Sequence, residues 1–161
     1  MTPAETQKPG SLSLSRALAQ LNAHLGDVSG NCQKLLQMRA RAAAQGADII
    51  LTPEMFLAGY PADDLVLRAD FMNRIEAAIH RLAEATADGG PAIIVGAPCR
   101  DKDVLYNSAF ILDNGKIIAR RDKVNLPNYG VFDDKRHFTP GQLQGPVLVR
   151  GTRLGIAVCE D

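Results

Sequence analysis

A cysteine, a glutamate and a lysine each follow a short apolar stretch of the sequence. Cys159 comes directly after residues 154–158, a short apolar run with β-branched members that is typical of a buried strand. Glu54 and Lys123 lie three and two residues beyond the ends of two further runs of this kind. Reactive groups in α/β sheets collect at the carboxyl ends of strands. We therefore expect the three side chains to meet at one sheet edge, provided that their strands share a sheet and a direction.

This trio would suit acyl transfer from an amide or a nitrile. Only the thiolate attacks well, and a free thiol has a pKa of about 8.5. The Glu54 carboxylate would therefore take the proton from Cys159 and return it to the leaving amine. The charge of Lys123 would favour the thiolate and stabilise the oxyanion, with the backbone N–H of Glu160 as a second donor. Water would then release the acid from the thioester.

Each member of the trio also has an ordinary structural interpretation. A lone buried cysteine is usually an inert small hydrophobe. Glu54 could begin a helix, and Lys123 could be the solvated end of a hairpin. Two other thiols are present. We expect Cys32 on the apolar face of a helix, whereas Cys99 ends a predicted strand before a charged turn and is the rival nucleophile.

Composition narrows the class of protein. The 161 residues suffice for one domain with a sizeable core. Eighteen basic residues balance eighteen acidic ones, which favours neither a nucleic-acid nor a membrane-surface partner. No stretch approaches the roughly 20 apolar residues of a membrane span. Three cysteines without metal-ligand spacing indicate a cytoplasmic protein with free thiols. No metal-site spacing is found for the three histidines, which are His24, His80 and His137.

The elements that must position the trio alternate between helices and strands, and hairpins follow. A first helix is predicted to start at Asp27 or Ser29 and to end at Gly46. A second helix is predicted to be capped by Asp70 and to stop before residues 89–90. Strands are expected at residues 48–51, 92–96, 105–112, 116–121, 147–149 and 154–158, whereas residues 12–21 could form a strand or a short helix. This order predicts a mixed α/β sheet covered by helices on one face.

Three blocks around the trio resemble the active-site blocks of a known superfamily. They are residues 51–55 (Leu-Thr-Pro-Glu-Met), 121–127 (Arg-Asp-Lys-Val-Asn-Leu-Pro) and 155–161 (Gly-Ile-Ala-Val-Cys-Glu-Asp). In order and rough spacing they are similar to those of the nitrilase (carbon–nitrogen hydrolase) superfamily. The resemblance places the catalytic Glu-Lys-Cys triad on Glu54, Lys123 and Cys159. It also implies a four-layer α-β-β-α sandwich, of which this chain would hold about the first half.

Two longer stretches are more specific within the superfamily. Residues 59–65 and 126–138, together with residues 19–27, are similar to the amidase domain of the glutamine-dependent NAD⁺ synthetases. The resemblance covers nearly all of residues 12–161 and makes the ambiguous segment 12–21 a strand. It implies that the chain hydrolyses glutamine. The ammonia would then pass to a C-terminal ATP-dependent domain that amidates deamido-NAD⁺.

The same resemblance implies roles outside the triad. Tyr60 and Tyr129 would line the glutamine pocket, and Glu160 would hold the amino group of the substrate. Packing of a loop by a half-buried aromatic ring is an equally good interpretation for either tyrosine. The neighbouring acids are expected to be solvated, with Arg136 paired to one of them; these acids are Asp63, Asp64, Asp133 and Asp134.

The resemblance also implies how the chain is organised. Residues 1–10 are expected to be a disordered lead-in, and residues 11–161 the N-terminal part of the amidase domain. The synthetase domain, with its ATP and Mg²⁺, has no counterpart here, since no Gly-rich phosphate loop is present. We expect a fragment that carries no cofactor or metal of its own and is inactive when isolated. A sheet without its full cover leaves unpaired edges, so association into a homo-oligomer is also expected.

Two alternative functions stay open. The chain could belong to a stand-alone amidase or nitrilase of the same superfamily, which the sequence following residue 161 would decide. It could also be a non-catalytic module that kept the triad by descent. In that case Cys159 would show only ordinary thiol reactivity.

Overall fold

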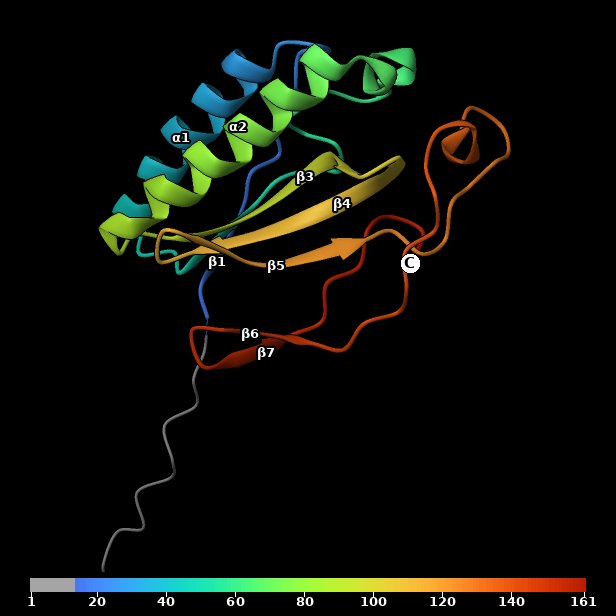
Figure 1. Cartoon of the computed structure of the whole chain (residues 1–161). Coiled ribbons are helices and arrows are strands. Elements are labelled where there is room, and N and C mark those ends of the chain that lie inside the picture. The colour runs from blue at the N-terminus through green and yellow to red at the C-terminus, as the bar shows by residue number, and fades with distance from the viewer. Residues whose placement is uncertain (1–13) are drawn as a thin grey trace, which may run out of the picture.

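Two helices cover one face of a five-stranded sheet, and a two-stranded hairpin lies against the other face (Figure 1). The computed structural model describes residues 14–161, so the lead-in expected at residues 1–10 lies outside it. The helices are α1 (Val28–Ala44) and α2 (Ala69–Ala85), with short 3₁₀ turns at Asp63–Leu67, Thr86–Asp88 and Asp134–Arg136. The strands are β1 (Arg16–Leu18), β2 (Ile49–Leu51), β3 (Ala92–Asp101), β4 (Val104–Asp113), β5 (Lys116–Asp122), β6 (Val147–Val149) and β7 (Thr152–Leu154). Within residues 14–161, no helix combines the length and apolar character that crossing a membrane requires.

The direction of the strands brings two of the predicted site residues to one edge. The sheet order is β1-β2-β3-β4-β5. The first three strands are parallel, and β4 and β5 each run antiparallel to their predecessor. Strands β2 and β5 therefore share a direction, and both end at the same edge of the sheet. The mixed sheet predicted from the sequence is confirmed, and the ambiguous segment 12–21 contains strand β1.

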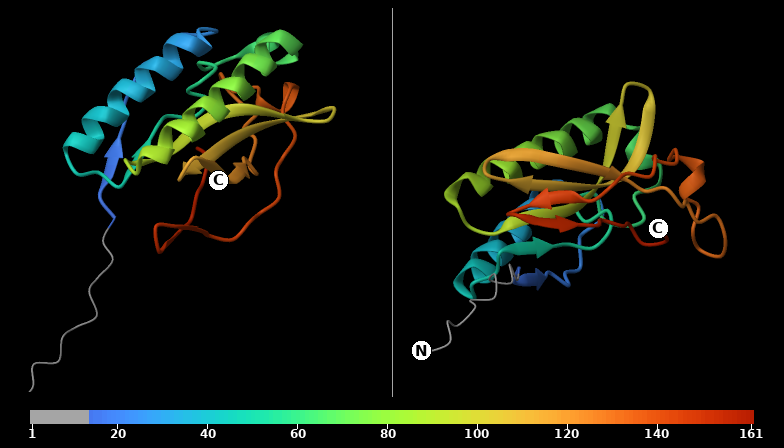
Figure 2. Two further views of the ribbon diagram at one scale, coloured as in Figure 1. Left: turned by 60° about the vertical axis from the view of Figure 1, so that its left-hand side comes forward. Right: turned by 90° about the horizontal axis from the view of Figure 1, so that it is seen from below.

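Alternation along the strands builds two apolar cores. On one face, Val95 and Phe110 pack against the two helices. On the other face, Ile94 and Ile111 pack against Val149 of the β6–β7 hairpin. Because successive side chains of a strand point to opposite faces, a continuous apolar run such as that of β3 supplies both cores. Figure 2 shows the resulting α-β-β order, which matches three layers of the expected four-layer sandwich.

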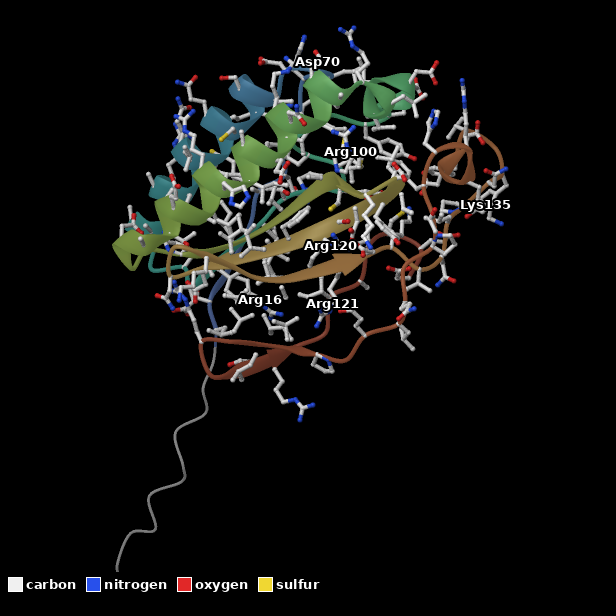
Figure 3. The ribbon with its side chains drawn as sticks, in the orientation of Figure 1. Arg16, Asp70, Arg100, Arg120, Arg121 and Lys135 are labelled. Atoms are coloured by element: carbon white, nitrogen blue, oxygen red, sulfur yellow. The ribbon has the colours of Figure 1, made fainter. Side chains whose placement is uncertain are left out.

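The first residue of each helix is set by the backbone conformation, and it does not always follow the residue whose type favours a cap. Asp27 caps α1, because its carboxylate accepts the Gly30 N–H at 2.9 Å; Ser29 already lies inside the helix. The predicted cap of α2 is wrong. Arg68 has an extended backbone and precedes the first helical residue, so Asp70 falls within the first turn. There it lies exposed at the N-terminal end of α2 (Figure 3), where its negative charge interacts favourably with the helix dipole.

The last predicted strand is also placed wrongly. Strand β7 stops at Leu154, which pairs with Val147 at the start of β6. Residue 146, the next partner position, precedes the start of β6, so no strand is available to pair with residues 155–158. Residues 155–158 run on without strand pairing. Cys159 consequently lies in a turn five residues beyond the last residue of β7, not at the end of a strand.

Candidate active site

The loop after β2 crosses over β3 to deliver Glu54. Residues 53–55 pass directly above Gly96 of β3, where a Cβ atom would lie 2.6 Å from both the Met55 nitrogen and the Pro53 oxygen. Only glycine permits such a close approach of backbone to backbone. The crossing carries Glu54 from the second strand of the sheet to the side chains that follow the fifth.

A substitution at the crossing point tests this arrangement. Gly96→Ala is expected to lower the free energy of unfolding by about 1–3 kcal/mol, because the crowded neighbours are backbone atoms that cannot rotate away. Urea unfolding followed by circular dichroism measures the change. Gly145→Ala is the matched control, since nothing lies within 4 Å of its Cβ position, and a change below about 0.5 kcal/mol is expected there. Equal stability of the two variants would contradict the crossing.

Lys123 is the centre of a buried ion-pair network directly after β5. Its side chain is 1% exposed, and its Nζ lies 2.7 Å from Glu54 Oε1 and 2.8 Å from Asp134 Oδ2. Burial lowers the pKa of Lys123, but the hydrogen bonds to Asp134 and Glu54 outweigh burial and hold that pKa above its ordinary value. The ammonium therefore stays charged at neutral pH. Its interpretation as a solvated hairpin end is wrong.

Asn107 of β4 links the two strand ends. Its Nδ2 donates a hydrogen bond to Glu54 Oε1 at 2.7 Å, and its backbone carbonyl accepts the Lys123 N–H at 2.8 Å. Glu54 and Lys123 are thus attached to the same residue of the strand that lies between them.

Cys159 is held in a turn by the carboxylate of the residue that ends it. The backbone φ of Cys159 is +51°, a left-handed conformation that is uncommon for a residue with a side chain. Asp161 Oδ1 accepts the N–H groups of Val124 and Asn125, both at 2.8 Å, and its Oδ2 accepts the Val158 N–H at 3.2 Å. These bonds fasten the turn to the loop after β5.

The electrostatic surroundings of Cys159 keep its thiol protonated at neutral pH. Burial raises the pKa of Cys159, and the charge of Glu54 and a hydrogen bond to its carboxylate raise it further. The charge of Lys123 acts in the opposite direction. Attack by Cys159 therefore requires transfer of its proton to a base, and Glu54 is the carboxylate whose charge acts most strongly on the thiol. Both side chains line a cleft of about 290 Å³ that opens to solvent.

The two tyrosines and the glutamate expected at the substrate pocket flank this group. The Tyr129 hydroxyl donates to Glu160 Oε1. The Tyr60 hydroxyl lies 3.4 Å from Asp134 Oδ1. Burial and the nearby carboxylates, above all Asp134, raise the pKa of Tyr60 to about 12, so its hydroxyl stays a donor. The structure thus brings all six predicted site residues into one region.

The rival thiols lie elsewhere. Cys32 belongs to the core beneath the helices. Cys99 lies within β3, on the helix side of the sheet, and accepts a hydrogen bond from Arg120 Nη1 at 3.0 Å. Figure 3 shows Arg120 and Arg121 leaving β5 on opposite sides, and Arg121 binds the Gly145 carbonyl before β6. Burial raises the pKa of both rival thiols, and the charged groups beside Cys99 are Arg120 and its partners Asp101 and Asp122, not Lys123 and Glu54.

Three residues of the site were not anticipated. Asp134, expected to be a solvated acid, is buried against Lys123, because the 3₁₀ turn at residues 134–136 directs it inward. Nothing local distinguishes it from its neighbour Asp133. Asn107 carried a usable signal, since a polar residue inside an apolar strand needs a buried partner. The role of Asp161 had no local signal. The expected pairing of Arg136 with a loop acid is confirmed by its 3.0 Å contact with Asp64.

These features are arranged as a cysteine hydrolase would require, and comparison with known proteins identifies the family. The profile of the family described as carbon-nitrogen hydrolase matches residues 16–161, so the chain belongs to that family.

Its relatives include glutamine-dependent NAD⁺ synthetases. That of Thermotoga maritima is 38% identical over 144 residues, covering 89% of this chain and 25% of the relative. That of Rhodobacter capsulatus is 40% identical, covering 89% and 26%. The chain thus spans about a quarter of the length of these relatives.

Solved structures of synthetases and amidases have a fold similar to that of this chain. The synthetase of Acinetobacter baumannii, bound to ADP, superposes with a TM-score of 0.85 at 37% identity, covering 91% of this chain and 27% of that one. An amidase from Nesterenkonia sp. AN1 superposes with a TM-score of 0.80 at 31% identity, covering 91% and 56%.

Proposed function

We propose that this chain forms the glutamine-hydrolysing amidase part of a cytoplasmic, glutamine-dependent NAD⁺ synthetase. One observation carries the proposal: a buried, charged Lys123 is paired with Glu54, and Glu54 and the Cys159 thiol line the same cleft. The names of the relatives support glutamine as the amide and NAD⁺ synthesis as the purpose.

The reaction uses the three side chains in turn. Cys159 Sγ attacks the side-chain amide carbon of glutamine while its proton passes to Glu54. The carbonyl electron pair moves onto oxygen, where Lys123 and the backbone N–H of Glu160 stabilise the negative charge. The C–N bond then breaks, and Glu54 returns the proton so that ammonia leaves. Water, deprotonated by Glu54, hydrolyses the thioester to glutamate and regenerates the thiol.

The remaining assignments follow from this reaction. Glu160, hydrogen-bonded to Tyr129, would bind the α-ammonium of glutamine, and Tyr60 would close the pocket beside Asp134. The ammonia would be consumed by a synthetase domain that uses ATP and Mg²⁺ to amidate deamido-NAD⁺. We further propose that the protein works as a homo-oligomer.

A covalent probe tests the proposed function. A glutamine analogue that carries a diazoketone in place of the amide is expected to alkylate Cys159, as read by peptide mass spectrometry, and to leave Cys32 and Cys99 unmodified. Cys159→Ala should give no adduct and no release of glutamate from glutamine. Labelling that is distributed over all three cysteines, or glutamate release by Cys159→Ala, would overturn the proposal and favour a non-catalytic module.

A stand-alone amidase is the second candidate, because the Nesterenkonia amidase has a comparable fold. A glutamate-to-glutamine mutant of that amidase carries the acetamide moiety of fluoroacetamide at its active-site cysteine. Comparing glutamine with butyramide separates the candidates. A glutaminase should prefer glutamine because Glu160 binds its ammonium, whereas an aliphatic amidase should prefer the apolar amide.

A further inference from the structure

We infer that Asn107 is a positioning residue that orients Glu54 as the catalytic base, an inference that rests on the proposed function. Asn107 lies in β4, is 1% exposed, and donates through Nδ2 to Glu54 Oε1 at 2.7 Å. Its side chain shares a face of the sheet with Ala109 and Ile111, both of which are apolar.

The hydrogen bonds divide the two oxygens of Glu54 between two tasks. Oε1 receives two donors, Asn107 Nδ2 and Lys123 Nζ, each at 2.7 Å. The terminal torsion of a glutamate is broad, so a single donor would leave the carboxylate plane free to rotate. Two donors on one oxygen fix that plane. Oε2 is then left to accept the proton of the Cys159 thiol.

The cost of the arrangement indicates that it is not mere filling of the core. Asn107 Oδ1 is buried and has no hydrogen-bond partner among residues 14–161. An unsatisfied buried amide oxygen costs about 1–3 kcal/mol, which an apolar residue here would avoid. Reversing the amide would bring Oδ1 against the Glu54 carboxylate, two acceptors facing each other, so the donor orientation is the one that the site requires. The hydrogen bond to Glu54 is therefore the reason that asparagine, and not an apolar residue, stands at this position.

Asn107→Asp provides the decisive test because it replaces the donor by an acceptor of the same shape. At pH 8 the new carboxylate repels Glu54, and kcat/KM for glutamine should fall about 10²-fold relative to the wild type. At lower pH the two carboxylates share a proton, and the new side chain again donates to Glu54. The ratio of variant to wild-type kcat/KM should therefore rise by up to about tenfold per pH unit as the pH falls, the slope for one proton.

Two further variants separate positioning from structure. Asn107→Leu keeps the size without the donor, and it should lower kcat at every pH while leaving KM unchanged. Ser108→Ala changes the adjacent residue, which points to the opposite face and bonds to Asp122, and its ratio to wild type should be flat with pH. Helix content is followed by circular dichroism for each variant in the full-length protein.

Each outcome has a defined meaning. A wild-type protein without Cys159-dependent glutamate release would defeat the proposed function itself. Two outcomes would assign Asn107 a purely structural role. One is an active wild type for which the ratio of Asn107→Asp does not change with pH. The other is that both Asn107 variants lose helical signal together with kcat at every pH. A ratio that rises as the pH falls confirms the inference.

Discussion

Replacing Lys123 by methionine is expected to remove glutamine hydrolysis and to lower the free energy of unfolding by about 3–5 kcal/mol. The ammonium is 1% exposed and binds two carboxylates, those of Glu54 and Asp134, at 2.7 and 2.8 Å. Without it, the buried Asp134 carboxylate has no cation beside it and the Glu54 carboxylate loses its charged partner. Catalysis should also lose the charge that stabilises the oxyanion, a loss of about 10²–10³-fold in kcat before any misplacement of Glu54.

The pH dependence of this stabilisation has a definite sign. The pKa of Lys123 is raised in the folded chain, so its contribution is fully present below the unfolded value of about 10.4 and is lost only as the pH rises through the higher folded value. The stability difference between the wild type and Lys123→Met should thus be constant from pH 7 to pH 9 and narrow only in strongly alkaline solution.

A double variant controls for the loss of charge balance. Lys123→Met combined with Asp134→Asn removes one of the two stranded carboxylates and should recover part of the lost stability without restoring activity. Urea unfolding and glutamate release measure the two effects separately. A Lys123→Met protein as stable as the wild type would show that the buried network does not form.

Replacing Glu54 by glutamine is expected to move two measurements in opposite directions. Glutamine hydrolysis should fall by about 10³–10⁴-fold, since the amide cannot accept the thiol proton. Alkylation of Cys159 by iodoacetamide at pH 7.5 should become faster. The charge and hydrogen bond of Glu54 raise the pKa of Cys159 while Lys123 lowers it, so removing the carboxylate lowers that pKa and increases the thiolate fraction.

The other thiols serve as internal references for this experiment. Cys32 and Cys99 should react at the same rate in the wild type and the variant, as measured on their own peptides. Glu76→Gln, on the exposed side of α2, is the matched glutamate control and should leave both turnover and Cys159 alkylation unchanged. If alkylation and turnover fell together in Glu54→Gln, the carboxylate would be activating the thiol in the ground state, contrary to the mechanism proposed here.

Much of the framework followed from local patterns. Apolar runs bounded by turn residues marked strands β2 to β5 of the main sheet, and the Asn-Gly pair at residues 114–115 fixed the β4–β5 hairpin. The same patterns placed Glu54 and Lys123 at strand ends. These features depend on side chains a few residues apart, which is the range over which sequence periodicity carries information.

Tertiary structure alone decided how the site is assembled. Glu54 meets Asn107 and Lys123 across 53 and 69 residues of sequence, and Asp161 holds a backbone N–H that lies 37 residues away. The crossing at Gly96 depends on the shape of the sheet edge. The inward turn of Asp134 depends on the buried Lys123 ammonium, which needs a carboxylate partner there. Residues 155–158 lack their predicted strand because the opposite strand, β6, begins only at Val147, which pairs with Leu154. The sequence by itself determined which residue types stand at the ends of the strands; the fold determined which of them touch, because burial leaves each polar group only the partners that the chain brings within reach.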